Sequence, residues 1–411
     1  MRPIFPACLV LLATSATAEE PRFPKFKAQE IATDLTVGYA VITADINEDR
    51  KPDIVVVDSK RVVWYENPTW KVHSVIAGKT KPDNVCIAAH DIDGDGHLDL
   101  VLGADWNPSN TKTGGTLQWL KRGKTLDEEW TVYPIGEEPT VHRVRIADID
   151  GDGKAQIILA PLHGREATAK GNWMDGRPVR ILAYPIPKDP IKGPWEPKVL
   201  SEELHVVHNI WPIPAVKQGS DQSALLAVSY EGVHAVGLRD GKWVTNQIGA
   251  GNQANPKGSR GASEIKLGIL KSTNPDTPYI ATIEPWHGNE VVIYTRPENM
   301  GDLWRRHLLD DHLRWGHAVW CADLDGDGDE ELIVGVRDNP AKGDKFTEKC
   351  GVRIYKSTDA TRHKWARELV DEGGVAVEDL TVADLNGDGK PDIIAVGRAT
   401  KNAKIYWNQG K

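Results

Sequence analysis

The chain has 411 residues, a net charge of -9 and four cysteines. The acidic balance argues against a nucleic-acid partner. Three cysteines remain beyond the N-terminal segment (Cys86, Cys321 and Cys350), an odd and small number that excludes a disulfide framework and leaves at least one free thiol. Beyond that segment no stretch is long and apolar enough to span a membrane, so we expect no membrane insertion. We also expect the protein to be a monomer.

The first 18 residues have the pattern of a secretory signal peptide. Arg2 supplies positive charge, residues 7–13 are apolar, and Ala16-Thr17-Ala18 is a small-residue cleavage site. We expect the mature chain to begin at Glu19 and residues 19–411 to form one domain. The protein is therefore predicted to be exported, either to the periplasm or to the medium.

An acidic nine-residue motif, typified by Asp91-Ile92-Asp93-Gly94-Asp95-Gly96-His97-Leu98-Asp99, recurs along the chain. Copies start at residues 45, 91, 148, 323 and 384. Two degenerate copies fit the gap between 148 and 323, one following His208 and one following Ser263. Seven units result, and repetition at such a period is typical of propellers and solenoids.

A second marker gives the same count. An aromatic residue heads a short strand before each unit, at Phe26, Trp70, Trp130, Trp195, Trp243, Trp304 and Trp365. The first such strand precedes the first acidic motif and none follows the last. The N-terminal strand over residues 26–32 is therefore expected to complete the last unit and close the ring.

Within a unit, short Val- and Ile-rich runs alternate with Gly, Pro, Asn and Asp turns, which indicates strands. In the third unit we expect strands over residues 143–148, 157–161 and 179–184, and an outer strand from Trp195. No ten-residue amphipathic pattern separates the runs, which argues against an α/β fold. The predicted fold is all-β, a seven-bladed β-propeller with four strands per blade.

The acidic motifs predict calcium sites. Carboxylates at alternating positions converge when the chain curls, and glycine permits the curl. Position 12 lies in a strand and is not Glu, which excludes an EF-hand. The alternative is an acidic turn without metal. The expected ligands are Asp45, Asn47, Asp49, Asp53, Asp91, Asp93, Asp95, Asp99, Asp148, Asp150, Asp152, Asp323, Asp325, Asp327, Glu331, Asp384, Asn386, Asp388 and Asp392.

The Asp-x-Asp-Gly-Asp-Gly-x-x-Asp units resemble the FG-GAP and VCBS-type repeats of secreted propellers, over essentially the whole mature chain. The units that carry histidine also resemble the propeller domain of aldos-2-ulose dehydratases, and similar propellers occur among polysaccharide lyases. The first resemblance implies the fold. The second implies an activity on keto-sugars.

Six residues before each acidic motif stand Tyr39, Val85, His142, His208, Ser263, His317 and Glu378. Innermost strands begin here, so these residues are expected to ring the channel mouth on the face opposite the acidic loops. A structural repeat does not require His142, His208, His317 and Glu378. Imidazole with carboxylate suits Zn²⁺ or Mn²⁺, so we predict a transition-metal site, with His205 as an alternative to His208.

Loops after the second strands reach the same face. Within them His163, His287 and Tyr230 are predicted to transfer protons, although each is also an ordinary turn or packing residue. Trp106 and Trp286, with Trp315, are expected to stack on sugar or pack internally. Arg143, Arg398 and Glu264 are the predicted contacts to a polar or anionic substrate group.

Two functions remain open. The first is a metal-dependent carbohydrate lyase or dehydratase that abstracts a proton from a keto-sugar or uronate and eliminates the β-substituent. The second is a non-catalytic, calcium-stabilised propeller that binds glycan or protein. A hydrolase using Glu264, Glu284 or Glu378 is a third hypothesis. The chain has no nucleophile elbow, Walker loop or dinucleotide fingerprint.

Overall fold

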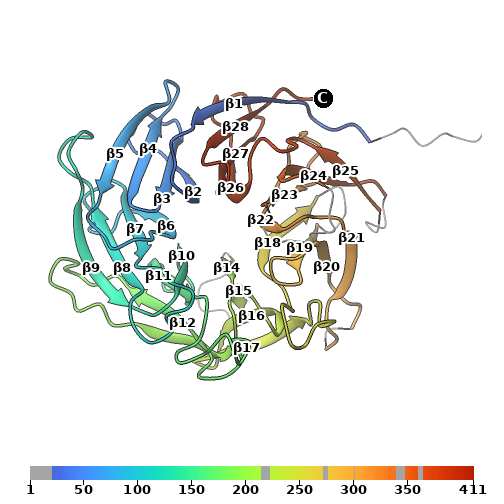
Figure 1. Ribbon diagram of the computed structural model, residues 1–411, viewed down its shortest axis with the longest axis horizontal. Coiled ribbons are helices and arrows are strands. Elements are labelled where there is room, and N and C mark those ends of the chain that lie inside the picture. Colours follow the sequence, from blue (N-terminus) through green and yellow to red (C-terminus); the bar gives the residue numbers. More distant parts are fainter. Residues whose placement is uncertain (1–20, 214–222, 272–275, 300, 339–347, 360–363) are drawn as a thin grey trace, which may run out of the picture.

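The computed structural model describes residues 21–213, 223–271, 276–299, 301–338, 348–359 and 364–411. The predicted signal peptide lies outside these residues. The described part contains 28 strands in seven four-stranded antiparallel sheets and no helix, and hence none that would cross a membrane. The sheets surround a central opening (Figure 1), which confirms the seven-bladed propeller.

Each blade runs from the channel outward in chain order. The innermost strands are β2 (Gly38–Ala44), β6 (Cys86–His90), β10 (Val141–Ala147), β14 (Asn209–Pro212), β18 (Glu264–Leu270), β22 (Gly316–Ala322) and β26 (Val377–Ala383). The second strands are β3 (Asp53–Asp58), β7 (Asp99–Ala104), β11 (Gln156–Pro161), β15 (Ser223–Ser229), β19 (Thr277–Glu284), β23 (Glu331–Val336) and β27 (Asp392–Gly397).

The third strands are β4 (Arg61–Glu66), β8 (Thr116–Lys121), β12 (Val179–Pro185), β16 (Gly232–Arg239), β20 (Glu290–Thr295), β24 (Gly351–Ser357) and β28 (Ala403–Asn408). The outer strands are β5 (Lys71–Ala77), β9 (Thr131–Glu137), β13 (Lys198–Leu204), β17 (Lys242–Gly249), β21 (Arg305–Asp310), β25 (Trp365–Leu369) and β1 (Phe26–Ala32). The predicted strands of the third unit agree with β10 to β12 to within two residues, and β13 starts three residues after Trp195.

The core lies between neighbouring blades. Every residue of β3, β7, β11, β23 and β27 is buried. A strand covered on both faces reads as a continuous apolar run, as Ile157-Ile158-Leu159-Ala160 does in β11. In each of these blades the acidic motif forms the turn between the first and second strands. The motifs therefore lie on one face of the propeller.

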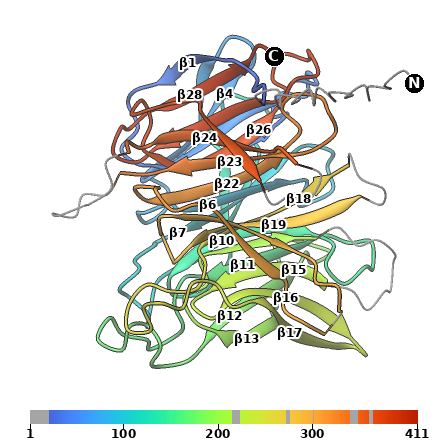
Figure 2. The same cartoon turned by 90° about the vertical axis from the view of Figure 1, so that its right-hand side faces the viewer.

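The ring is closed by β1. This strand pairs antiparallel with β28, from Phe26 opposite Asn408 to Ala32 opposite Ala403, and the last sheet has the order β1-β28-β27-β26. The blue N-terminal strand lies beside the red C-terminal blade in Figure 1, and the side view in Figure 2 also places them together. The predicted closure is confirmed, and it leaves no blade with an incomplete sheet.

The innermost strands begin with a bulge. In four blades the ladder skips one residue, namely Tyr39, His142, His317 or Glu378. In the other three, the N–H of Val85, His208 or Ser263 bonds the carbonyl of the residue that pairs with the next position. A bulge re-aims a side chain that strict alternation would turn away. The column aligned in the sequence is therefore a column of bulged residues.

Candidate metal centre at the mouth of the channel

The acidic loops have the curled backbone that the motif predicts. In the loop at Asp91, the carboxylate of that residue accepts the N–H groups of Gly94 at 2.8 Å and Gly96 at 2.9 Å. Both glycines have positive φ, 74° and 89°. Glu48 and Arg50 adopt the same left-handed conformation in the first loop, which explains how that copy keeps its shape without glycine.

Three acidic loops bring carboxylates together within 4.8 Å, those at Asp91, Asp148 and Asp323. Burial raises the pKa of the ninth-position residues Asp53, Asp99 and Asp392 to about 6 and that of Glu331 to about 8. A cation near such a buried carboxyl group lowers its pKa and stabilises the ionised form. In two loops Lys121 and Lys356, from the third strands, supply positive charge to the third and fifth positions.

Removing calcium is expected to lower the free energy of unfolding. At a free calcium concentration 100 times Kd, each occupied loop contributes about 2.7 kcal/mol. Asp388→Asn, in a loop whose lysine contact is the exposed Lys390 at 3.4 Å, should lose one such contribution and respond less to chelator. Thermal melts with calcium and with EDTA measure both effects. Identical melts in the two conditions would show that the loops are metal-free acidic turns.

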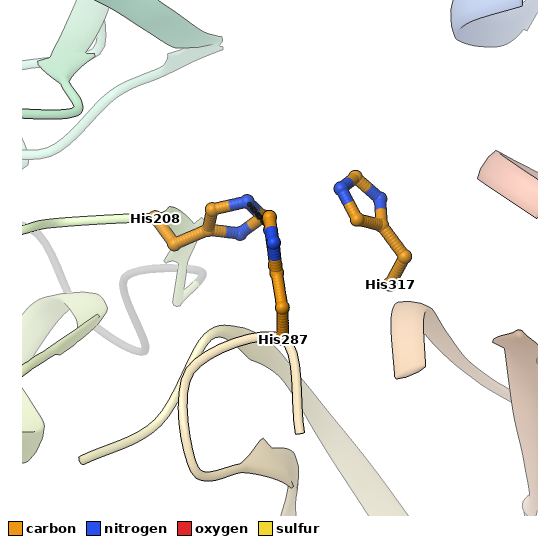
Figure 3. A group of neighbouring side chains, drawn as sticks. All are labelled: His208, His287 and His317. Carbon is orange, nitrogen blue, oxygen red and sulfur yellow. Dashed lines mark hydrogen bonds between the residues drawn. The ribbon is translucent and has the colours of Figure 1, made fainter. Parts of the chain in front are cut away.

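The opposite face carries a cluster of imidazoles. His208, His287 and His317 offer nitrogen atoms that lie within 4.8 Å of one another, and they point toward each other in Figure 3. The Nε2 atoms of His208 and His287 are 2.7 Å apart. His142 flanks this group, with its ring centroid 4.6 Å from that of His208. Four blades thus contribute to one site.

Backbone carbonyls fix the orientation of these rings. The Nδ1 of His208 lies 3.0 Å from the Ser263 carbonyl, and that of His317 lies 2.6 Å from the Glu378 carbonyl. A carbonyl only accepts, so each Nδ1 carries hydrogen and each Nε2 keeps its lone pair toward the cluster. His142 bonds the His208 carbonyl through Nδ1 at 3.0 Å in the same way. This is the arrangement found around metal-binding histidines.

Burial keeps the imidazoles neutral. It is the main cause that holds the pKa of His142, His287 and His317 well below the usual range. The pKa of His208 is also lowered, and the Glu264 carboxylate, 2.8 Å from its Nδ1, opposes that shift. Neutral imidazole is the form that coordinates a metal. Three nitrogen donors are the protein ligand set of some catalytic zinc sites.

His287 comes from the loop after β19. Its φ is 50°, a left-handed conformation that costs a non-glycine residue about 1–3 kcal/mol and is concentrated at functional sites. A Cβ on Gly288 would lie 2.2 Å from the Glu284 carbonyl oxygen, so only glycine fits there. The His-Gly pair therefore sets the path that carries the imidazole over the channel.

Tryptophans surround the cluster. The indole of Trp286 stacks on His287 at 3.9 Å, Trp315 lies 5.6 Å from the same ring, and Trp106 lies 5.9 Å from His142. All three indole Nε1 atoms are buried and lack a hydrogen-bond partner among the described residues. The indoles of the core residues Trp64, Trp119 and Trp130 are unpaired in the same way, so what distinguishes these three tryptophans is their contact with the histidine rings.

Glu378 occupies its predicted column but is engaged by two guanidinium groups. Arg337 and Arg398 bond its carboxylate oxygens at 2.9 Å and 2.8 Å. Its Oε2 lies 4.0 Å from the Nε2 of His317, which places it outside the three-nitrogen group. Arg337 also lies over Trp315. Arg337 follows β23 in one of the loops that were expected at this face, but the sequence did not indicate that it pairs with Glu378.

Arg143 and Glu264 lie one layer deeper. Their side chains are 3.4 Å apart, and Glu264 also accepts a bond from Asn209 at 2.5 Å. Glu264 thereby supports His208 from below, a position that differs from the predicted contact to substrate. His205, the alternative to His208, bonds Glu231 at 2.9 Å instead.

His163 and Tyr230 lie beside the three-nitrogen cluster and are not members of it. His163 stacks on Trp173 at 4.0 Å and its Nδ1 lies 2.8 Å from the Pro108 carbonyl. Tyr230 packs near Trp286, with ring centroids 6.2 Å apart. Burial raises the pKa of Tyr230 and lowers that of His163 to about 4. Both side chains are therefore expected to be uncharged at neutral pH.

Acid should destabilise the fold through His163. The unfolded side chain binds a proton near pH 6.5 and the folded one near pH 4, so stability present above pH 6.5 is lost as pH falls through that interval, by about 3 kcal/mol at most. His163→Phe should reduce the slope of unfolding free energy against pH by the contribution of one proton, and the other buried histidines keep theirs. The matched variant His312→Phe, at an exposed site, should leave it unchanged. An unaltered slope in His163→Phe would contradict this assignment.

Two family models match this chain. Residues 114–297 match the β-propeller domain of aldos-2-ulose dehydratase, and residues 45–102 match the FG-GAP-like repeat. Aldos-2-ulose dehydratase of Phanerodontia chrysosporium is 25% identical over 333 residues, which cover 75% of this chain and 35% of that protein. Integrin alpha-PS2 of Drosophila melanogaster is 26% identical over 200 residues, 42% of this chain and 14% of the integrin. Both predicted resemblances are confirmed.

Solved structures share the fold. BBS1N, in a complex with ARL6DN, superposes with a TM-score of 0.52 at 12% identity, covering 94% of this chain and 96% of BBS1N. The extracellular domain of BT4673 from B. thetaiotaomicron gives a TM-score of 0.52 at 11% identity, covering 93% of this chain and 39% of that one. The chain spans about a third or less of the two curated relatives described above.

Proposed function

We propose that this propeller is an exported, metal-dependent carbohydrate lyase that dehydrates a keto-sugar or eliminates from a uronate. The observation that most strongly supports this proposal is the cluster of His208, His287 and His317, whose nitrogen atoms lie within 4.8 Å of one another. The similarity to aldos-2-ulose dehydratase over 75% of the chain supports a sugar-derived substrate. The predicted signal peptide supports export, and the net charge of -9 supports a substrate other than nucleic acid.

The three histidines would hold Zn²⁺ or Mn²⁺, and their buried, neutral rings suit that role. Such a metal polarises a carbonyl or carboxylate and so acidifies the adjacent C–H group. His142, beside the cluster, is the candidate proton acceptor, and its low pKa requires a substrate C–H group that the metal has made acidic. Its Nδ1 is fixed by the His208 carbonyl, which leaves the Nε2 lone pair free to take that proton.

Substrate is bound by the groups around the metal ligands. The unpaired indole N–H groups of Trp106, Trp286 and Trp315 would donate to sugar oxygens, and their faces would pack on the ring. Arg337 and Arg398 share one carboxylate, that of Glu378. Two cations on one anion leave positive charge for a carbonyl oxygen or uronate. The proton taken by His142 would be returned to the departing oxygen, which leaves as water or as an alcohol.

A direct assay tests this function. Protein loaded with zinc or manganese is incubated with an aldos-2-ulose or with an oligouronide, and the conjugated product is followed by ultraviolet absorbance. Product from the aldos-2-ulose assigns a dehydratase, and product from the oligouronide assigns a polysaccharide lyase. Absence of product from both, with the metal bound, would reject the lyase.

A non-catalytic binding module is the second candidate. The match to integrin alpha-PS2 and to the FG-GAP-like repeat favours it, because that similarity rests on the repeat and requires no histidine. Such a module would contain calcium alone. Glycan or protein binding that survives replacement of all three clustered histidines would support this alternative.

A further inference from the structure

The central channel contains a second polar site beneath the histidine cluster. A cavity of ≈ 310 Å³ lies among the innermost strands. Its charged lining comes from Arg143 and Arg145 of β10, Glu264 and Lys266 of β18, and Asp379 of β26. The remaining wall is largely aliphatic, with Ala40, Ile42, Ile87, Ile146, Val319 and Leu380. The cavity therefore combines buried charge with an apolar surface.

Lys266 is the unusual member of this lining. Only 4% of the residue is exposed, and its Nζ lies 3.2 Å from the centroid of Trp211 and 4.1 Å from that of Trp320. It has no hydrogen bond or ion pair with any residue that the structure describes. The centroids of the two indole rings are 5.6 Å apart. Because this is shorter than the two distances from Nζ added together, the ammonium does not lie on the line between the rings, and both rings contact it from one side. The other N–H directions are left for a ligand.

The carboxylates of the cavity are already engaged. Glu264 is held by His208 and Asn209, and Asp379 accepts the backbone N–H of Val41 at 3.1 Å. Arg145 donates to the Val144 carbonyl and to Asn209, and its buried Nε has no partner in the described chain. Two cations thus face the cavity without a bonded carboxylate.

A buried cation without a direct ion pair is costly, even where carboxylates such as Glu264 and Asp379 lie in the same cavity. Burial and the nearby Arg145 lower the pKa of Lys266 well below its ordinary value, while the two indole faces favour the ammonium form. An anion between Lys266 and Arg145 would offset the same cost. The alkyl part of an organic anion would pack against the aliphatic wall. An inorganic oxyanion has no alkyl part and would gain nothing from that wall.

We propose that the channel cavity binds a small carboxylate, held by Lys266 and Arg145, with its short carbon chain against the aliphatic lining. The site is separate from the histidine cluster and requires neither a metal nor catalysis. It therefore stands or falls independently of the proposed lyase activity.

Calorimetric titration with propionate tests the proposal. The wild-type protein should bind one propionate per chain, and Lys266→Met, which keeps an unbranched side chain between the indoles, should bind at least about tenfold more weakly. Lys242→Met, at an exposed site on β17, is the matched control and should bind normally. Sulfate should bind more weakly than propionate. Equal propionate binding by Lys266→Met, or none by the wild type, would overturn the proposal.

A crystal structure of the wild-type protein with propionate gives a second test that does not depend on folding of the variant. The expected result is carboxylate density within hydrogen-bond distance of the Lys266 Nζ. An empty cavity, or density elsewhere only, would exclude the site.

Discussion

His317→Ala is expected to abolish turnover, with a loss of stability no larger than that of His234→Ala, a change at a comparable buried histidine. The substitution removes one of three nitrogen donors in the cluster, and loss of the metal should lower kcat/KM by about three orders of magnitude or more, roughly 4 kcal/mol of barrier. The folded state should lose about 1–3 kcal/mol, because the change removes a buried side chain and its hydrogen bond to the Glu378 carbonyl. Steady-state kinetics with thermal melts measure both quantities.

His234→Ala is the matched control for this experiment. His234 is also a buried histidine with a lowered pKa, but it lies on the third strand β16, away from the channel. It should retain turnover and lose stability by about 1–3 kcal/mol. Full activity in both His317→Ala and His142→Ala would reject the catalytic assignment.

A chain that begins at residue 33 is expected to lose most of its stability. Removing β1 deletes the strand that pairs with β28 over residues 26–32 and leaves the last blade with three strands. The lost ladder bonds, at about 1 kcal/mol each, amount to on the order of 5 kcal/mol. That is comparable to the whole stability of a typical domain. Chemical denaturation should show an early transition, with aggregation through the exposed β28 edge.

A chain that begins at Pro21 keeps all of β1 and should unfold like the longer protein. A synthetic peptide of residues 21–32, added to the truncated chain, should restore stability by pairing with β28. If the truncated chain unfolds at the same denaturant concentration as its control, closure by β1 is not what holds the ring together.

The fold was predictable because two independent sequence signals repeat with it. The five acidic motifs with their two degenerate copies, and the aromatic residues that head the outer strands, both give seven units. The order of the two markers along the chain indicated the role of β1. The described strands confirm this to within a few residues. Local turn chemistry and strand burial carry such information within each unit, so no knowledge of distant contacts was needed.

The candidate site was predictable only in part. The column of His142, His208 and His317 follows from alignment of the repeats, and these residues do lie together. The membership of His287 and the engagement of Glu378 depend on how far loops extend across the channel. The pairing of Lys266 with two indoles joins three different blades. The sequence of one unit does not show which of its side chains contact those of another blade.

Elemental analysis of the purified protein is the most direct test of the central claim that the channel mouth holds a transition metal. About one zinc or manganese ion per chain is predicted for the wild-type protein, in addition to calcium, and that ion should be absent from His208→Ala while the calcium content is unchanged. Calcium alone in the wild-type protein, or zinc that persists in His208→Ala, would contradict the account.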